Sequence, residues 1–263
     1  MRHLNLITSF FKASAQEDMA YRSNFWIHIL HTLLNTVTGA LGLWILFQQI
    51  QTLHGWNFAS ALAILGVYLT LDAIRHLVIG PSFEALAGMG QEVWSGNFDF
   101  TLLRPVDTQF LVSFRHWNVF AFFDLSLGIG VIIAAALQSG NALDILQIII
   151  FLVVLLCGLL ALYAILLIFT GFVFWSSAFT FAWVFDAIFQ MARYPVKLYP
   201  GWLRLVLTWV IPVGLMTTLP AQALMGTLSW DLLLVSLIVS IVLLLLASTL
   251  FHHALHRYNS ASS

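Results

Sequence analysis

The stretch ILQIIIFLVVLLCGLLALYAILLIFTGFVFWSSAFTFAWVF, residues 145–185, contains no Asp, Glu, Lys or Arg. One transmembrane helix needs about 20 predominantly apolar residues, because the hydrocarbon core of a bilayer is about 30 Å thick. This stretch of about 40 residues is therefore long enough to cross a bilayer twice. It predicts two spans, residues 145–169 and 174–191, joined by a turn near residues 171–177.

The composition of the whole chain agrees with this prediction. Its 263 residues are 61% hydrophobic and 8% charged, with a mean hydropathy of +0.95. A soluble domain carries about 25% charged residues. The apolar runs are long and do not alternate, which argues against an outer-membrane barrel. A net charge of −1 offers no basic surface for nucleic acid. We predict an all-α integral membrane protein with one transmembrane domain over residues 1–263.

Further apolar segments predict four more spans, at residues 25–47, 58–79, 110–137 and 230–250, which makes six in total. Residues 1–23 mix apolar positions at helical spacing with polar ones, which predicts a helix lying in the membrane interface; a disordered tail is the alternative. The polar segment 80–109 would not be tolerated in the bilayer core. We expect it in water or at the interface, with a short helix over residues 82–93.

Prolines concentrate near the C-terminal end, where four of the six lie between Pro195 and Pro220. Proline removes a backbone donor and fixes φ, so a straight span is not expected here. Residues 201–219 are nevertheless apolar. Broken apolar helices predict a re-entrant pair within residues 193–220, covered by protein or by a water-filled cavity. The alternative is a single span kinked by proline.

The distribution of Lys and Arg predicts the orientation. With six spans, seven basic residues lie on the side of the two termini and three on the other side. The seven are Arg2, Lys12, Arg22, Arg75, Arg104, Arg115 and Arg257, and the three are Arg193, Lys197 and Arg204. Because cytoplasmic loops carry the excess of basic residues, both termini and segment 80–109 are expected in the cytoplasm. The proline-rich segment is expected outside.

Catalytic motifs are missing from the sequence. A P-loop needs a Gly-Lys-Ser/Thr end that holds phosphates, and neither Lys12 nor Lys197 follows a glycine. We therefore predict no nucleotide hydrolysis, no catalytic residue and no enzyme activity in this chain. The histidines cluster as His28 with His31 and as His252, His253 and His256, without the nearby carboxylates that a catalytic zinc site would use. No metal site is predicted, and the single Cys157 is expected to be a packing residue.

Three carboxylates lie within the predicted spans, Asp72, Asp124 and Asp186. Charges inside a membrane are costly and usually face a bundle interior or a water-filled path. Asp72 can pair with Arg75 or His76 on its own helix. Asp186 lies two turns before Arg193. Asp124 has no local partner, so we expect it in a polar cavity or an interhelical bond. Structural pairing and the lining of a substrate path both remain open for all three carboxylates.

Three short motifs carry a resemblance to a known family. They are AYRSNF at residues 20–25, GNFDFTLLRP at residues 96–105, and the proline positions RYP at 193–195, YP at 199–200, IP at 211–212 and LPA at 219–221. With the order of the spans, they resemble the ABC-2 type exporter permeases, and more narrowly the subfamily related to daunorubicin and viologen exporters. By topology the resemblance covers the whole chain.

This resemblance implies a six-helix fold with an N-terminal interfacial helix, a cytoplasmic coupling helix and external re-entrant helices. It further implies a multi-pass protein of the bacterial inner membrane, and a second permease, identical or related, above two ATPase subunits that hold the ATP and Mg²⁺. No cofactor is expected on this chain. The coupling helix would come from residues 82–93, with Glu84 and Glu92 contacting the ATPase and with Asp99 and Arg104 bracing the loop.

The function implied is ATP-driven export of an amphipathic or lipid-like substrate through the membrane. Weakly charged, aromatic-rich spans fit such a substrate, but they also fit any lipid-facing helix. An ion-coupled secondary transporter is the alternative, because Asp72, His76 and Asp124 could form a short intramembrane relay. Membrane lipid is an expected partner of either one.

Overall fold

The fold of this chain is known from a computed structural model, which describes residues 2–20, 22–53, 55–87, 92–140, 144–175 and 182–258. Five helices in these residues are long and apolar enough to cross a membrane, and a sixth candidate is a bent helix pair. The predicted all-α membrane fold is confirmed. The long helices are α2 (Arg22–Gln49), α3 (Phe58–Ile74) with its continuation, α8 (Ala121–Gln138), α9 (Ile145–Gly171) and α13 (Trp230–Leu255).

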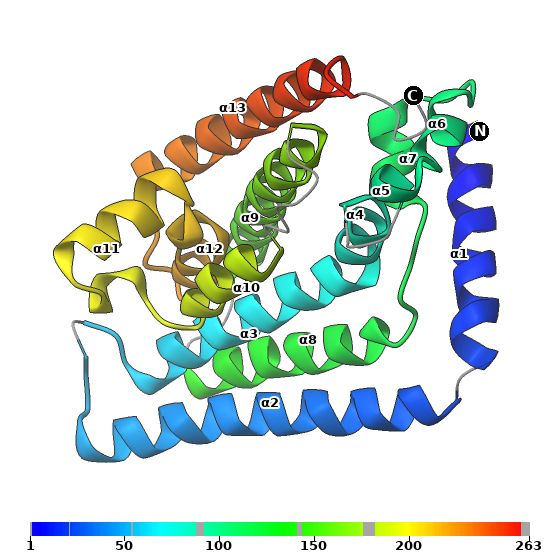
Figure 1. The fold of residues 1–263 in the computed structure, drawn as a ribbon. Coiled ribbons are helices and arrows are strands. Elements are labelled where there is room, and N and C mark those ends of the chain that lie inside the picture. The colour runs from blue at the N-terminus through cyan, green and yellow to red at the C-terminus, as the bar shows by residue number, and fades with distance from the viewer. Residues whose placement is uncertain are drawn as a thin grey trace.

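The long helices form two groups, and the short elements gather at two opposite ends of the molecule (Figure 1). Helices α2, α3 and α8 run side by side, and α9 and α13 lie above them in this view. Residues Arg2–Ala20 form a helix, α1, which stands across the end of α2. The end of α13 and the short helices between the second and third spans gather at the same end as α1. The proline-rich segment lies at the opposite end, which agrees with the predicted grouping of the loops.

The second span is longer than the sequence suggested. We expected it to end at Ile79, but α3 continues through a π-helical turn, η1 (Arg75–Ile79), into α4 (Gly80–Ala87). Pro81 removes one backbone donor from this continuous helix, and the Leu77 carbonyl accepts from the N–H of Asn118 instead, at 2.9 Å. The short helices α5 (Glu92–Ser95) and α6 (Phe98–Leu102) follow. The predicted helix over residues 82–93 therefore covers parts of α4 and α5, and residues 88–91 lie outside the described part.

The third span is interrupted near its start, so the prediction of one helix over residues 110–137 is wrong there. Helix α7 (Thr108–Phe114) begins after Asp107, whose carboxylate accepts a hydrogen bond from the backbone N–H of Phe110 at 2.8 Å. Non-helical residues 115–120, called the linker below, then lead into α8. The linker differs from the prediction because its backbone N–H groups bond to neighbouring elements instead of to a helix of its own.

The long uncharged stretch begins as expected. Helix α9 ends at Gly171 and is followed by the 3-10 turn η2 (Phe172–Phe174). The predicted turn at residues 171–177 therefore agrees where it is described, and residues 176–177 lie outside the described part. The predicted fifth span, residues 174–191, is described only in its second half. That half consists of α10 (Ala182–Gln190) and the turn η3 (Met191–Arg193).

The proline-rich segment forms a bent helix pair. After η4 (Val196–Leu198), one arm comprises α11 (Gly201–Leu205) and η5 (Val206–Val210), and the other comprises η6 (Gly214–Thr218) and α12 (Leu219–Leu224). The arms meet at 75° around Pro212, which cannot donate a backbone hydrogen bond. Helix α13 begins at the end of the molecule where this segment lies and runs back to the α1 end. A bend of this size fits both a re-entrant pair and a span broken at Pro212, the two structures that the sequence left open.

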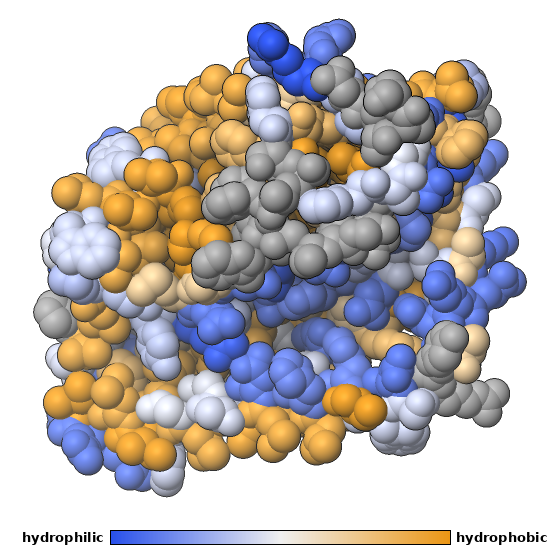
Figure 2. Space-filling view, in the orientation of Figure 1, coloured by the Kyte–Doolittle hydropathy of each residue, from blue (hydrophilic) through white to orange (hydrophobic). Residues whose placement is uncertain are grey.

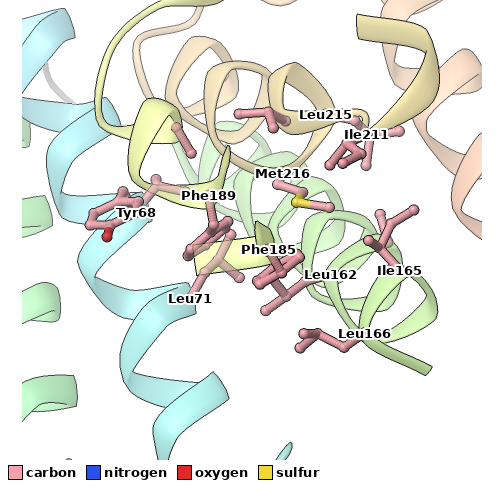
Figure 3. Close-up of a cluster of buried hydrophobic side chains, with 14 of the residues drawn as sticks. Tyr68, Leu71, Leu162, Ile165, Leu166, Phe185, Phe189, Ile211, Leu215 and Met216 are labelled. Carbon is pink, nitrogen blue, oxygen red and sulfur yellow. The ribbon is translucent and has the colours of Figure 1, made fainter. Parts of the chain in front are cut away.

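Close helix packing builds the core. An added Cβ would lie 2.8 Å from the backbone N of Ile132 at Gly66, and 2.7 Å from the backbone N of Thr70 at Gly128. Helices α3 and α8 thus approach backbone to backbone, as small residues allow in membranes. Gly158 of α9 has the same relation to Met216 of η6, with its added Cβ 2.7 Å from the carbonyl oxygen. Figure 3 shows the adjoining buried cluster, whose labelled members are Tyr68, Leu71, Leu162, Ile165, Leu166, Phe185, Phe189, Ile211, Leu215 and Met216.

Candidate functional site

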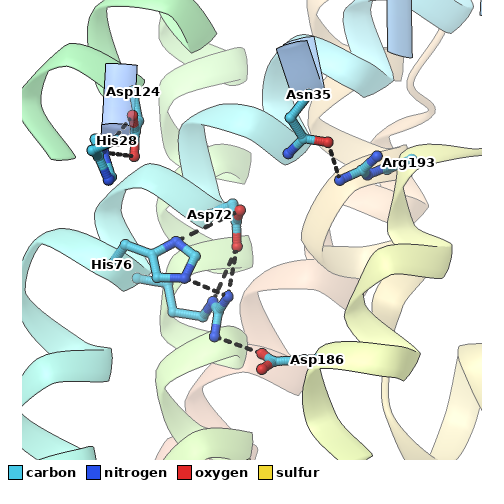
Figure 4. Close-up of polar contacts among 8 residues, drawn as sticks. His28, Asn35, Asp72, His76, Asp124, Asp186 and Arg193 are labelled. Atoms are coloured by element: carbon cyan, nitrogen blue, oxygen red, sulfur yellow. Dashed lines mark hydrogen bonds and ion pairs between the residues drawn. The ribbon is translucent and has the colours of Figure 1, made fainter. Parts of the chain in front are cut away.

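Arg75 is the centre of a polar cluster within the spans (Figure 4). It lies one turn after Asp72, and it donates to Asp72 Oδ1 from Nε at 3.1 Å and from Nη2 at 2.9 Å. Its Nη1 donates to Asp186 Oδ1 of α10 at 2.7 Å. The Arg75 side chain is 11% exposed. A buried charge needs such partners, because an unpaired one carries a large desolvation penalty. Two carboxylates from different helices therefore share one guanidinium.

Arg193 forms a second polar contact, at the end of η3. Its Nη2 donates to Asn35 Oδ1 of α2 at 2.9 Å, and its guanidinium carbon lies 4.9 Å from the ring centroid of Tyr68. The sequence spacing suggested that Asp186 could meet Arg193. Instead, Asp186 pairs with Arg75 and Arg193 bonds to Asn35, because α3 and α2 bring these partners in from elsewhere in the chain.

Buried aromatic rings connect the two arginines. The Tyr68 ring lies 5.1 Å from the Phe189 ring, which is stacked on Phe185 at 5.4 Å. The guanidinium carbon of Arg75 is 5.9 Å from both phenylalanine centroids, within the range of cation–π attraction. This row of rings could not be predicted, because phenylalanine and tyrosine are common throughout the apolar spans.

Asp124 of α8 pairs with His28 of α2. The His28 Nε2 lies 2.9 Å and 3.0 Å from the two carboxylate oxygens. Of the two environments considered for Asp124, the structure contains the interhelical bond. His28 therefore does more than fill space between helices, since it supplies the partner that Asp124 lacks on its own helix.

We call these residues the polar seam: His28, Asn35, Asp72, Arg75, His76, Asp124, Asp186 and Arg193. They come from α2, α3, η1, α8, α10 and η3, and they bring all three predicted carboxylates into one region. Figure 2 shows hydrophilic residues in a band across the middle of this face, above the apolar surface of α2. The side chains of His76 and Asp186 are each 43% exposed. The seam therefore reaches the surface at the level of the spans.

The residues predicted to couple the chain to a partner lie at the α1 end of the molecule. Glu84 and Arg104 are exposed, and Asp99 lies in the first turn of α6. Glu92, in contrast, is engaged within the chain. It forms an ion pair with Arg115, and its Oε2 accepts a hydrogen bond from the Thr101 hydroxyl at 3.1 Å. Arg115 was counted in the sequence only as a basic residue, because nothing in the spacing connects it to Glu92.

Metal ligands do not gather in the described part of the chain, where no group of three or more His, Cys, Asp or Glu side chains could hold an ion. His252 lies 3.7 Å from Asp107, with both side chains about half exposed. Cys157 is a buried free thiol.

Comparison with known proteins identifies the family. The family model described as ABC-2 family transporter protein matches residues 33–262, which is most of the chain. No curated protein and no solved structure matches it. The matched region contains all the long helices except the first part of α2, together with nearly the whole polar seam. The chain belongs to the ABC-2 transporter family, and it is a multi-pass membrane subunit of an ABC transporter.

Proposed function

We propose that this chain is the permease subunit of an ATP-driven exporter that moves an amphipathic or lipid-like substrate out of the cytoplasm. The observation that carries the proposal is the polar seam. It places three carboxylates and two arginines inside an otherwise apolar bundle. Lipid chains cannot satisfy such groups, so intramembrane charges of this kind are typical of substrate paths. Asp72, Asp124 and Asp186 are the candidate path residues.

The half-exposed positions of the seam point to the place of the path. Asp186 accepts from Arg75 through Oδ1, and 43% of its side chain is exposed at the level of the spans. A second permease, identical or related, would cover this face and enclose the path between the two subunits. An amphipathic substrate would contact the seam with its polar part and the surrounding apolar side chains with the rest.

Mechanical work would enter at the α1 end of the molecule. In this proposal the segment from α4 to α6 faces two ATPase subunits in the bacterial cytoplasm, and both termini lie on that side. Glu84 is the exposed candidate contact, whereas Glu92, Asp99 and Arg104 keep the segment in shape. Closure of the ATPase dimer on ATP would move this segment and shift the two permeases relative to each other, which favours an outward-facing state.

The test uses the chain together with a candidate ABC ATPase subunit from the same genome. Reconstituted in liposomes, the complex should move a fluorescent amphiphile uphill with ATP and should not do so with a non-hydrolysable analogue. Deletion of residues 82–93 should abolish co-purification with the ATPase. Purified chain that pumps the amphiphile uphill without any ATPase would contradict the proposal.

The competing function, ion-coupled secondary transport, would require this member of the ABC-2 family to work without an ATPase. The contact between His28 and Asp124 favours it, because a histidine beside a carboxylate can relay a proton. This alternative predicts uphill transport driven by a pH gradient in liposomes that contain the chain alone. The same liposome experiment therefore separates the two functions by their energy source.

A further inference from the structure

The linker is a joint at which several elements meet. Its five consecutive backbone N–H groups, from His116 to Phe120, all donate hydrogen bonds, although none is part of a helix. The acceptors are Ser82 Oγ at 3.0 Å for His116, Ser14 Oγ at 3.1 Å for Trp117, the Leu77 carbonyl at 2.9 Å for Asn118, Asp18 Oδ2 at 2.8 Å for Val119, and Asn118 Oδ1 at 3.1 Å for Phe120. Four of the five bonds therefore join the linker to α1, η1 or α4.

Pro81 explains why one of these acceptors is free. In a regular helix the carbonyl of Leu77 would accept from the N–H of residue 81, but proline has no N–H. The Asn118 N–H takes that position at 2.9 Å. Ser82 next to it both donates to the His116 carbonyl at 2.9 Å and accepts from the His116 N–H. The linker is thus bonded to η1 through Leu77 and to the start of α4 through Ser82, one on each side of Pro81.

Helix α1 holds the linker from the other side. Phe11, Ser14 and Asp18 are three and four residues apart, so they share one face of α1. The Phe11 ring lies edge-on to Trp117 at 5.6 Å and to Phe122 of α8 at 6.2 Å. Ser14 is 8% exposed although it is a polar residue of an otherwise well-exposed helix. This face of α1 is therefore committed to the linker and to the start of α8.

The remaining end of the linker contacts α5 and α6. Arg115 pairs with Glu92, and its Nη1 donates to Thr101 Oγ1 at 3.3 Å. Burial lowers the pKa of the next residue, His116, and the Arg115 guanidinium lowers it further, so His116 adds no charge here near neutral pH. The linker thus touches every short helix of the segment that, in the proposed function, receives the work of the ATPase.

We propose that Ser14 and Asp18 are positioning residues, which fasten α1 to the linker so that α1, the α4–α6 segment and the start of α8 move as one body. This inference rests on the proposed function, because the motion is that of the ATP cycle. Its specific content is new: the hydrogen bond from Val119 to Asp18 passes the displacement of the α4–α6 segment to α1, and from α1 to the first span. Without that bond the ATPase still binds, but the displacement of the α4–α6 segment is not transmitted to α1.

The experiment compares Asp18→Ala with Asp18→Asn, because asparagine keeps an acceptor oxygen without the charge. Glu17→Ala is the matched control, since Glu17 is the exposed neighbour on the same helix. Each variant is measured alone in nanodiscs by amide hydrogen exchange at residues 116–120. Each is also measured with the ATPase for co-purification and for ATP-driven transport of a fluorescent amphiphile.

Asp18→Ala should raise the exchange rate of the Val119 amide and lower transport, each by about tenfold, which corresponds to the loss of one hydrogen bond to a charged group. Its co-purification with the ATPase should persist. Asp18→Asn should restore most of both readouts, and Glu17→Ala should match the unmodified chain. Full transport by Asp18→Ala despite faster exchange would overturn the inference, and so would an Asp18→Asn variant as defective as Asp18→Ala.

The two proposals fail in distinguishable ways. If the unmodified complex shows no ATP-driven transport, the proposed function fails, and the coupling role of Asp18 fails with it. The exchange measurement needs no ATPase, so it judges the hydrogen-bonded joint by itself. If exchange at Val119 is unchanged in Asp18→Ala, the joint is refuted even where the complex transports its substrate.

Discussion

Helices α2 and α3 are neighbours of similar character that are held in the bundle in different ways. In the apolar window of the run that starts with α3, 78% of residues are buried, against 11% in that of α2. Helix α3 meets α8 backbone to backbone through Gly66 and Gly128. Helix α2 is joined to the same bundle by the bond between His28 and Asp124 and by Asn35, which accepts from Arg193. The fit of Gly39 on Leu65 is looser, since an added Cβ would lie 3.2 Å away.

This difference separates a rigid part of the molecule, α3 packed on α8, from a detachable part, α2. Backbone contacts between α3 and α8 leave no space for one helix to slide past the other without losing packing. Polar bonds between α2 and its neighbours can break and re-form at small cost, because interhelical hydrogen bonds in membranes contribute about 0.6 kcal/mol on average. We infer that α2 can change its position while α3 and α8 stay together.

The largest expected effect comes from removing Arg75 from the rigid part. Arg75→Gln leaves Asp72 and Asp186 without their shared cation, and we expect a loss of about 3 kcal/mol in the free energy of unfolding, as for other broken buried ion pairs. Unfolding with SDS in mixed micelles measures it. Arg257→Gln, which changes an exposed arginine after the end of α13, serves as the control and should have little effect. A loss as small as that of the control would show that the ion pairs do not hold α3 to α10.

A smaller effect is expected from Gly128→Ala, which tests the backbone contact between α3 and α8. The added methyl group would lie 2.7 Å from Thr70, so the helices must separate, at a cost of about 1–3 kcal/mol. Gly130→Ala is matched to it on the same helix, because an added Cβ there meets nothing within 4 Å. The same unfolding titration should show that Gly130→Ala is neutral or slightly stabilising. Equal losses in both variants would remove the distinction between the rigid and detachable parts.

The smallest effect is expected at the attachment of α2. A double-mutant cycle of His28→Ala and Asp124→Ala should give a coupling energy of about 0.6 kcal/mol. His31→Ala changes an exposed histidine of the same helix and should not couple to Asp124. A His28–Asp124 coupling as large as the loss in Arg75→Gln would place α2 in the rigid part.

The sequence predicted those elements whose signal lies in one uninterrupted run. Helices α9 and α13 follow directly from long stretches without charge, and the prolines indicated the bent pair around Pro212. Partners from distant parts of the chain could not be predicted in the same way. Asp186 has Arg193 within two turns, yet it bonds to Arg75, because the packing of α10 on α3 decides which cation is near. The linker could not be predicted for a similar reason, since its acceptors Ser14 and Asp18 lie about 100 residues earlier in the chain.

The bent pair between residues 201 and 224 has a consequence for how the protein enters the membrane. Each arm is about half the length needed to span the hydrocarbon core, so neither arm is a stable insertion segment by itself. The prolines leave some of its carbonyl groups without a helical donor, and these groups need protein around them before they can leave water. Met216 packs closely against Gly158 of α9, a helix that is synthesised earlier. Assembly of this region therefore requires α9 to be in place, and a larger residue at Gly158 should disturb that step.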